Sequence, residues 1–373
     1  MRKLLYLWMF SMLVSASGVQ AATFTVDNNG DIDNALGYVA ADGTNTLRKC
    51  IRLANATAVL DTVLFNIPGP PYLITAATAL IITRPVYIDG LSQPGAAPGN
   101  LIIELNGTNA VSNGALQLSG VNSSGSTIRG LVIYGSERGI YVNVSNNTTI
   151  ICSHIGTNAG GTARIATPDT LLHGIYIINS QNTIIGGTGG IAERNIISGC
   201  GQNGIRIGTT STGTVIMGNY IGTDITGTAL IPNNQVTGGP YAGIFCATGS
   251  NNTTIGGPTS NYRNLISGNK QRGIYLQTSV SCLIRNNYIG TGISGNSSIP
   301  NINNGIETTT TCTGVMVLDN VISSNGQDGV KISASDNAVV KGNKIGLGSD
   351  GITQLGNGNH GLEILNSLSA TIG

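Results

Sequence analysis

Charged side chains are scarce in this sequence. Asp, Glu, Lys and Arg make up 9% of the 373 residues, whereas a globular domain usually has about a quarter. Aromatic residues account for only 5%. A disordered chain would combine few apolar residues with many charges, so a hydrophobic share of 40% excludes disorder. We expect a packed chain with a mostly neutral surface.

Long hydrophobic runs are also missing, except at the N-terminus. There Arg2 and Lys3 form a positive segment, Leu4 to Val14 an apolar core, and Val19-Gln20-Ala21 a small-x-small cleavage site. These features predict that residues 1–21 are a signal peptide and that the protein is secreted or exposed at the cell surface. No later stretch is as long as a transmembrane helix, so no transmembrane segment is expected.

A strong excess of charge is absent too. The balance of 18 − 17 = +1 becomes 16 − 17 = −1 once Arg2 and Lys3 are removed with the signal peptide. Binding to nucleic acid requires a basic surface, because the phosphate backbone has to be neutralised. We therefore expect no nucleic-acid partner.

The six cysteines form no C-x-x-C pair and have no zinc-ligand spacing with histidine, so we expect no metal site. Export permits disulfides, but a chain of this length does not depend on them. We expect mostly buried thiols, with one or two bridges between turns as the alternative. The cysteines are Cys50, Cys152, Cys200, Cys246, Cys282 and Cys312.

Glycine, in contrast, is abundant, at 54 residues, and much of it belongs to a repeat. The segment RNIISGCGQNGIRIGTTSTGTVIMGNYIG (Arg194 to Gly222) returns in related form at Arg263 to Gly290 and at Asp319 to Gly346. A repeat of this length indicates a solenoid, in which each unit packs on its neighbours. We expect one elongated domain.

Within each unit, apolar and polar residues alternate with the period of a β-strand. In Gly204-Ile205-Arg206-Ile207 the two isoleucines point one way and Arg206 the other. The shortest interval between such segments, 329 − 305 = 24 residues, is close to one bare coil of a parallel β-helix. An α-solenoid is excluded because no helical period follows residue 60, and a propeller because its blades need four strands in about 40 residues. Residues 61–373 are therefore assigned to a β-helix about 50 Å long.

Two further regularities support stacked coils. Four insertions follow Ile-Gly and carry glycine at their fifth place, which predicts a row of hairpin-like loops; these glycines are Gly161, Gly227, Gly295 and Gly351. Asparagine recurs at turn positions and predicts two ladders. One ladder would contain Asn195, Asn264 and Asn320, and the other, at a different corner, Asn219, Asn287 and Asn343.

Residues 22–60 are predicted to cap the first coil. Thr23 to Asp27 is typical of a short strand, and Thr44-Asn45-Thr46 offers an N-cap to the helical segment LRKCIRLANA. One face of this helix would carry Leu47, Cys50, Ile51 and Ala54. A helix laid across the end of a solenoid covers its apolar cross-section and its unpaired strand edges.

The series TLRKCIRLANA, DTVLFNIPGP, ITRPVYIDGLSQPGA, IIELNG and IRGLVI resembles the start of a bacterial family of exported right-handed parallel β-helix repeat proteins, which opens with an S-L-R-x-A-I type motif. The likeness continues through the IGT and IGG repeats. Asn45 and Thr46 stand where some members carry Cys followed by Ser, and Cys50 stands where Ala is usual. The resemblance implies an all-β, right-handed parallel β-helix of the pectin-lyase-like superfold, often part of a larger surface protein, without one established activity.

If Ile205 and its equivalents face inward, the residue after each faces outward, and one external row results. The row is Tyr141, Tyr176, Arg206, Phe245, Tyr275, Glu307, Lys331 and Glu363. We interpret its first five residues as a ligand-binding surface, because aromatic rings on a rigid sheet can stack against sugars or another protein. The alternative is that these rings pack along the row and only strengthen the sheet.

Glu307, Lys331 and Glu363 are weak catalytic candidates. The two glutamates would lie two coils, or roughly 9 to 10 Å, apart, near the separation of the carboxyl groups in an inverting glycosidase. A lysine between them would keep both ionised, which opposes the role of a general acid. A simple charge ladder explains the same alternation.

Related folds include pectate lyases and polygalacturonases, so cleavage of polysaccharide is the main enzymatic alternative. A hydrolase needs clustered carboxylates, and a lyase needs acidic calcium ligands beside an Arg or Lys base. The remaining acidic and imidazole groups are predicted at turn, loop and surface positions, without such a cluster. They are Asp224, Asp328, Asp336, Asp350, His154, His173 and His360.

Our hypothesis is a secreted or cell-surface β-helix that acts as a non-enzymatic adhesin or structural rod. Its expected partner is carbohydrate or a host or cell-surface component, and no cofactor is expected. The alternative is a polysaccharide lyase or glycoside hydrolase acting on an extracellular polysaccharide, with calcium in the lyase case. The sequence ends within a repeat at Gly373, so we expect the natural protein to continue into further domains, or another chain to cover this end.

Overall fold

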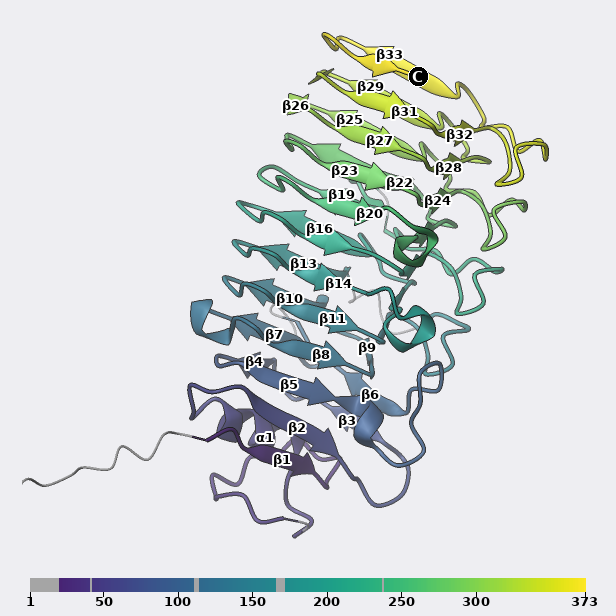
Figure 1. The fold of residues 1–373 in the computed structure, drawn as a ribbon. Helices are drawn as coiled ribbons and strands as arrows, with labels where there is room; N and C mark the ends of the chain where they lie inside the picture. Colours follow the sequence, from purple (N-terminus) through teal and green to yellow (C-terminus); the bar gives the residue numbers. More distant parts are fainter. Residues whose placement is uncertain (1–19, 41, 111–113, 166–171, 237) are drawn as a thin grey trace, which may run out of the picture.

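The computed structural model describes residues 20–40, 42–110, 114–165, 172–236 and 238–373. The positive segment and apolar core of the predicted signal peptide lie outside these residues. Among the described residues, no helix is long and apolar enough to cross a membrane. Each complete coil contributes one short strand to each of three parallel sheets, which we name A, B and C in the order in which the chain visits them (Figure 1).

Sheet A has twelve strands and extends from one end of the stack to the other. With strands about 4.8 Å apart, such a stack is about 50 Å long, in line with the length expected from the repeat. Its strands are β1 (Thr23–Val26), β2 (Asp61–Phe65), β5 (Val86–Asp89), β8 (Thr127–Arg129), β11 (Thr149–Ile151), β14 (Ile184–Ile185), β17 (Val215–Ile216), β20 (Thr254–Gly256), β23 (Leu283–Arg285), β27 (Met316–Leu318), β31 (Val339–Lys341) and β34 (Thr371–Ile372).

Sheets B and C have ten strands each. Sheet B consists of β3 (Leu73–Thr75), β6 (Ile103–Asn106), β9 (Leu131–Tyr134), β12 (His154–Ile155), β15 (Ile196–Ile197), β18 (Tyr220–Ile221), β21 (Leu265–Ile266), β24 (Tyr288–Ile289), β28 (Val321–Ile322) and β32 (Lys344–Ile345). Sheet C consists of β4 (Leu80–Ile82), β7 (Leu116–Ser119), β10 (Arg138–Asn143), β13 (His173–Ile178), β16 (Ile205–Gly208), β19 (Ala242–Cys246), β22 (Arg272–Gln277), β25 (Ile306–Thr309), β29 (Val330–Ser333) and β33 (Leu362–Leu365). A small pair, β26 (Cys312–Thr313) with β30 (Ser335–Asp336), lies between sheets C and A.

The core fills the space enclosed by the three sheets. Ile205 and Ile207 of sheet C, Ile216 of sheet A and Ile221 of sheet B are each 0% exposed and belong to one apolar cluster along the stack. Their equivalents in neighbouring coils lie directly above and below them, because all pairings are parallel and in register. The predicted right-handed parallel β-helix with a short N-terminal helix is confirmed.

The N-terminal helix forms where its cap signals lie. Helix α1 (Leu47–Ala54) begins after Thr46, whose side-chain oxygen accepts a hydrogen bond from the Lys49 amide at 3.2 Å. The predicted apolar face, with Cys50 and Ile51, is buried against the first coil. Strand β1 of the same segment pairs in parallel with β2, so sheet A already begins inside the region predicted as the cap.

Asparagine side chains connect the coils at the corner between sheets A and B. In each step the Nδ2 atom of one asparagine donates to the Oδ1 atom of the next at 2.9 to 3.1 Å. The members are Asn195, Asn219, Asn264, Asn287, Asn320 and Asn343, so the prediction that these six residues divide into two ladders at different corners is wrong. The reason is that the sequence repeat spans two coils, whose asparagines are 24 and then 45 residues apart.

A second asparagine ladder at the corner between sheets B and C was not predicted. It contains Asn233, Asn269, Asn301, Asn325 and Asn357, joined by Nδ2 to Oδ1 bonds of 2.8 to 3.0 Å. Insertions of different length precede these asparagines, so their spacing in the sequence is irregular. Both ladders satisfy buried backbone groups at the turns, which a corner residue without a side-chain amide would leave unpaired.

The predicted hairpin loops follow alternate strands of sheet B and stack on one another. Each is closed by an antiparallel bridge, as between Thr223 and Leu230. Successive loops are joined by backbone hydrogen bonds, from Ile225 N to Gly161 O at 2.9 Å and from Ile293 N to Gly227 O at 3.0 Å. Figure 1 shows these loops projecting from one side of the stack, which confirms the predicted arrangement.

The cysteines match the expectation of buried thiols, and not the alternative of disulfide bridges between turns. All six are free and buried. Burial raises the pKa of the Cys50, Cys200 and Cys282 thiols to about 12. Since the thiolate is the reactive form, these are inert packing groups.

Candidate functional site

The predicted external row is present on the outer face of sheet C, and we call it the sheet C row. Its residues pair strand to strand in an unbroken series: Tyr141, Tyr176, Arg206, Phe245, Tyr275, Glu307, Lys331 and Glu363. Each lies between two inward-facing residues, as Arg206 does between Ile205 and Ile207. The alternation of the strand therefore places eight consecutive side chains in line along the stack.

The rings of the sheet C row pack against one another. Tyr141 and Tyr176 are stacked, with ring centroids 5.5 Å apart, and Phe245 and Tyr275 are 5.0 Å apart. Tyr141, Phe245 and Tyr275 are consequently only 8%, 3% and 7% exposed. Among the aromatic residues of the row, only Tyr176 is partly exposed.

Three arginines alternate with these rings. The Arg206 guanidinium lies between the rings of Tyr176 and Phe245, at 5.4 and 5.2 Å from their centroids. Arg138 lies over Tyr141 at 4.7 Å, and Arg272 lies over Tyr275 at the same distance. The sequence prediction missed Arg138 and Arg272; their signal is an arginine directly before the glycine of the strand.

The ionic end of the row is internally paired. Glu307 forms a salt bridge with Arg272 and accepts a hydrogen bond from Asn304 Nδ2 at 2.7 Å. Lys331 Nζ lies 2.7 Å from Glu363 Oε2, and this hydrogen bond raises the pKa of Lys331. Both candidate carboxylates therefore have cationic partners, which stabilise their ionised form.

His360 and Asp328 meet beside the ionic end of the row. The Nδ1 and backbone N atoms of His360 lie 3.0 and 3.1 Å from Asp328 Oδ1, and the imidazole is largely exposed. Asp328 also contributes to the electrostatic environment of Lys331. His360 and Asp328 occupy the turn positions predicted for them, but the sequence did not predict that they form a pair.

The other two histidines are buried, which corrects the prediction of turn and surface positions. His154 is 3% exposed on the outer face of sheet B, because the following hairpin loop folds over it and Ala159 O lies 3.0 Å from its Nδ1. His173 is 6% exposed and lies against the Tyr176 ring. Burial lowers the pKa of His154 to about 4 and that of His173 to about 3.

Of the remaining acidic candidates, Asp224 and Asp350 accept hydrogen bonds within their own loops. Asp336, predicted at a turn, instead lies in β30 and accepts from the Leu368 amide at 2.8 Å. Asp224 accepts hydrogen bonds from the backbone of Thr228 and Ala229, and these bonds, with one from Thr226, lower its pKa despite partial burial. Asp350 accepts from Ile352 and Thr353, so its pKa falls to about 2. Across the ranges that the structure covers, no group of three or more His, Cys, Asp or Glu side chains is placed to hold a metal ion.

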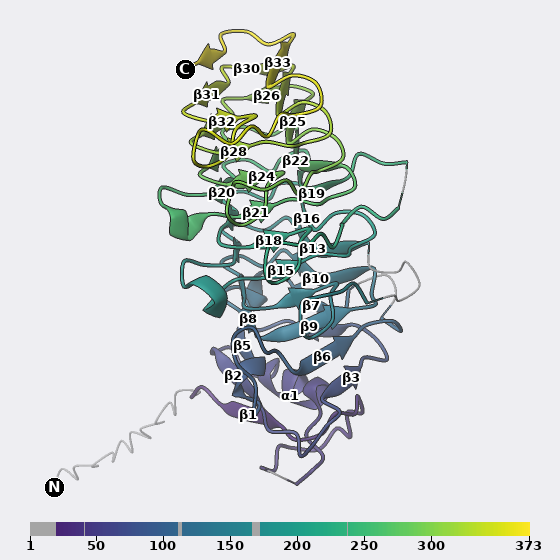
Figure 2. The same cartoon turned by 90° about the vertical axis from the view of Figure 1, so that its right-hand side faces the viewer.

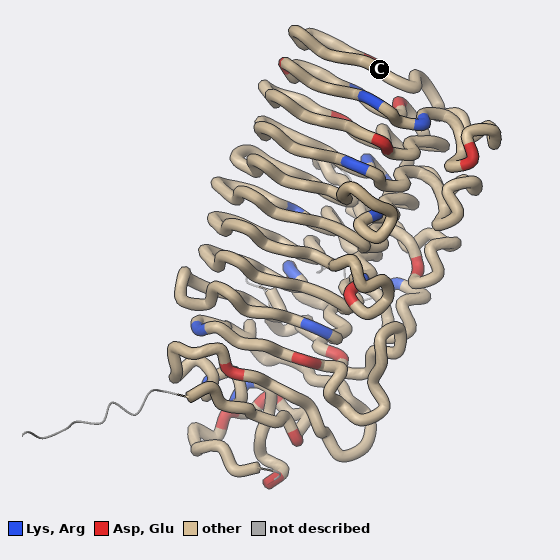
Figure 3. The backbone as a smooth tube through the Cα atoms, in the orientation of Figure 1, with Lys and Arg blue, Asp and Glu red and all other residues tan. Residues whose placement is uncertain are grey.

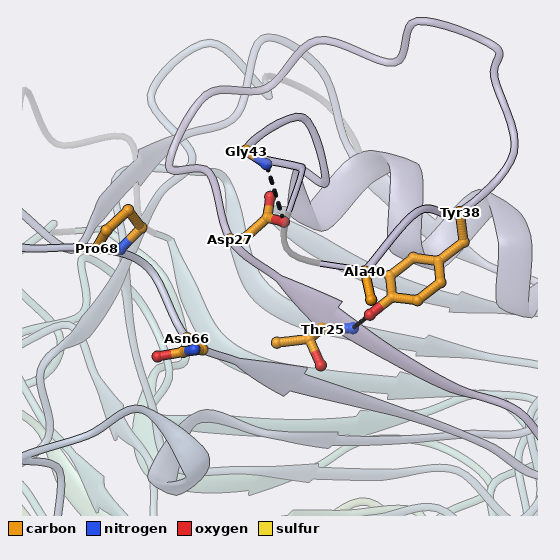
Figure 4. A pocket seen from close by; sticks show the side chains of 7 residues that line it. All are labelled: Thr25, Asp27, Tyr38, Ala40, Gly43, Asn66 and Pro68. Atoms are coloured by element: carbon orange, nitrogen blue, oxygen red, sulfur yellow. Dashed lines mark hydrogen bonds between the residues drawn. The ribbon is translucent and has the colours of Figure 1, made fainter.

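A cavity of about 370 Å³ lies at the N-terminal end of the stack (Figure 4). Asp27 reaches into it, but its oxygens accept from the Asn45 backbone and side chain at 2.8 Å and from the Gly43 amide at 3.2 Å. The Tyr38 hydroxyl in turn accepts from the Thr25 amide. These hydrogen bonds tie the segment around Tyr38, Gly43 and Asn45 to β1, so Asp27 serves to close the cap.

No family of known proteins and no curated protein matches the sequence. Among solved structures, the A-module of mannuronan C-5 epimerase AlgE4 from Azotobacter vinelandii superposes with a TM-score of 0.52 and 16% identity, covering 87% of this chain and 93% of that one. The enzymatically active domain of bacteriophage CBA120 tailspike protein 2 gives a TM-score of 0.53 and 13% identity, over 90% of this chain and 50% of that one. At such low identity the likeness establishes the fold alone.

Proposed function

We propose that this right-handed parallel β-helix is an exported, non-enzymatic rod that binds carbohydrate along the sheet C row, as an adhesin or a structural element of a cell surface. The observation that supports binding without catalysis is the row itself. Its aromatic half carries the partly exposed Tyr176 and Arg206, and its ionic half has both carboxylates engaged in salt bridges.

Carbohydrate is the ligand class that suits the aromatic half. Tyr176 and Arg206 are both partly exposed, and together they offer a hydroxyl group and a fork of N–H donors on a rigid sheet. Tyr141, Tyr176 and Arg206 place polar groups on three successive coils, which suits the repeating hydroxyl and ring oxygen atoms of a polysaccharide chain. That a mannuronan C-5 epimerase module shares this fold supports a polysaccharide as the partner.

The test of binding uses substitutions that keep the stack of rings intact. We expect Arg206→Gln to weaken binding to the preferred polysaccharide about tenfold, because one charge-assisted hydrogen bond is lost. Tyr176→Phe removes only a hydroxyl group and should have a smaller effect in the same direction. Lys341→Gln, which removes one exposed charge from sheet A, is the matched control. If Arg206→Gln bound like the control in affinity electrophoresis across a polysaccharide panel, the row would not be the binding surface.

A second candidate function is cleavage of polysaccharide by a lyase or glycoside hydrolase. The observation that favours it is the Asp328–His360 pair beside Lys331, with Glu307 and Glu363 on the two neighbouring coils. An imidazole oriented by a carboxylate can serve as a general base. Incubation with uronic-acid and neutral polysaccharides, with and without calcium, followed by assays for unsaturated and reducing ends, separates this function from binding alone.

A further inference from the structure

A groove runs along the outer face of sheet B, on a different side of the rod from the sheet C row. Its floor consists of the outward residues of successive strands: Ile196, Tyr220, Leu265, Tyr288 and Val321, which form an apolar cluster of their own. One wall is made by the short turns η3 (Gly190–Ala192) and η4 (Ser260–Tyr262). The other is made by the hairpin loops, which also pack over part of the floor, as Gly227 does against Tyr220 and Leu265. Figure 2 looks onto this face, with the two turns projecting at its left. We call it the sheet B groove.

Two arginines lie in this groove, each with its guanidinium over a tyrosine ring. Arg194 lies over the Tyr220 ring and Arg263 over the Tyr288 ring, each with its guanidinium carbon 4.0 Å from the ring centroid. Both pairs come from the sequence repeat, and they are two coils, or about 9.6 Å, apart along the stack. Stacking on a ring holds a guanidinium in a fixed orientation while its N–H groups stay free to bind.

The two guanidiniums lack acidic partners. Within the described parts of the chain, neither arginine forms a salt bridge, and the buried Nε atom of Arg194 has no hydrogen-bond partner. Arg263 donates from Nη2 to Asn286 Oδ1 at 2.8 Å and from Nε to Asn286 O at 3.2 Å, and both acceptors are neutral. Glu193, next to Arg194, is held by the amide of Gly189 instead.

The space between the arginines is hollow and carries no negative charge. A cavity of about 170 Å³ is lined by both arginines, by Tyr220 and Leu265 on the floor and by polar rim residues that include Asn261, with no carboxylate among the lining residues. Arg263 also lines the next cavity, of about 130 Å³, which reaches Lys344. The single acidic group lining that second cavity, Asp319, is already paired with Arg285 at 3.0 Å.

We propose that the sheet B groove binds an acidic polysaccharide, whose carboxylate or sulfate groups are held by Arg194 and Arg263 and whose chain lies parallel to the axis of the rod. A polymer with negative charges along its chain suits two cationic positions held two coils apart. The polar rim suits hydroxyl groups. An extended peptide recognised through its backbone would need an unpaired strand edge, and the strands beneath this groove are paired on both sides.

The test is calorimetric titration at low ionic strength with four probes: polygalacturonate for carboxylates, heparin for sulfates, dextran as a neutral chain and polyglutamate as an acidic peptide. We expect the wild-type protein to bind at least one of the two acidic polysaccharides and to prefer it over dextran and polyglutamate. Replacing both arginines, Arg194→Gln with Arg263→Gln, should weaken that binding about a hundredfold, about tenfold for each guanidinium. The matched control, Lys270→Gln with Lys341→Gln, removes the same charge from exposed positions elsewhere and should stay within about twofold.

A second variant separates a loss of binding from a loss of folding. Asn261→Glu adds a negative charge to the exposed rim without touching either arginine–tyrosine stack, and it should weaken binding of the acidic polysaccharide while leaving the melting temperature unchanged. Equal binding of wild type and the double arginine variant would overturn the proposal, as would equal affinity for dextran or polyglutamate. The double arginine variant leaves the sheet C row untouched, and Arg206→Gln leaves the groove untouched. Loss of acidic-polysaccharide binding in the first variant but not in the second supports the groove, whereas loss in the second but not in the first would assign this binding to the sheet C row and overturn the proposal made here.

Discussion

The outer faces of sheets B and C are built from the same alternation of inward and outward residues, yet they differ in what they present. On sheet C the outward side chains stack on one another and pair their own charges, from Arg272 with Glu307 to Lys331 with Glu363. On sheet B the outward residues form an apolar floor beneath the hairpin loops, and the cations above it lack acidic partners. The hairpin-loop insertions therefore cover sheet B and leave sheet C without such a cover. Charged residues are few along the rod (Figure 3).

The largest expected difference between the faces is in stability. Tyr220→Ala on sheet B should lower the free energy of unfolding by about 3 kcal/mol, because it leaves a cavity under the loops and removes the ring beneath Arg194. Tyr176→Ala on sheet C, where the ring is partly exposed, should cost about 1 kcal/mol. Urea unfolding monitored by circular dichroism measures both, with Tyr220→Phe as the control. Equal losses would mean that the loops do not bury sheet B.

The corner beside sheet B gives the next largest effect. The Asn219 side chain donates to Ile185 O and to Asn264 Oδ1, and it accepts from Asn195. Asn219→Ala leaves these buried groups unpaired and should cost about 2 to 3 kcal/mol, because each unsatisfied group carries a desolvation penalty. Asn359→Ala, at an exposed position, should cost less than about 0.5 kcal/mol. A loss at Asn219 as small as that at Asn359 would contradict a stabilising ladder.

Each face also buries one histidine, so acid should weaken both. Burial lowers the pKa of His154 to about 4, below its ordinary value of 6.5 in the unfolded chain. As the pH falls below about 6.5, the unfolded state gains a proton that the folded state does not, so stability decreases by about 1.4 kcal/mol per pH unit until the folded pKa is reached. Urea midpoints at pH 7, 6 and 5 should show a shallower decrease for His154→Gln than for wild type. Parallel curves would show that His154 is not buried in its neutral form.

The smallest effects concern the ion pairs of sheet C. Glu307→Gln should cost about 1 kcal/mol, because Glu307 is buried and bonded to both Arg272 and Asn304. Glu363→Gln should cost about 0.5 kcal/mol, since the pair with Lys331 is more open to solvent. Thermal unfolding of the two variants in parallel measures this order. The reverse order would indicate that the exposed pair is the more important one.

The repeat made the fold and the register of the sheet C row predictable from the sequence. The Gly-Ile-x-Ile pattern places Arg206 and its equivalents outward on every coil, and the structure pairs these residues in the predicted series. The cover of sheet B was not predictable, because it depends on how the hairpin loops fold back over His154 and Tyr220. Likewise, the single ladder through Asn195 and Asn219 requires knowing that one sequence repeat makes two coils.

The exposure of the predicted binding residues was the least predictable property. An outward position on a strand indicates which face a side chain is on, but stacking between coils covers most of Phe245 and Tyr275. Contacts between neighbours in the row depend on side-chain rotamers and on residues such as Arg272, which lie outside the simple alternation. The sequence therefore located the sheet C row, but it did not show which atoms of the row are exposed.

The proposed function requires that the rod binds polysaccharide without cleaving it. The most direct measurement incubates the purified protein with a panel of acidic and neutral polysaccharides, with and without calcium, and then assays retention on the protein together with new reducing or unsaturated ends. We expect retention of at least one polysaccharide with no new ends of either kind. Accumulation of new ends that stops in Lys331→Gln or His360→Gln would contradict it and would assign catalysis to the ionic end of the sheet C row.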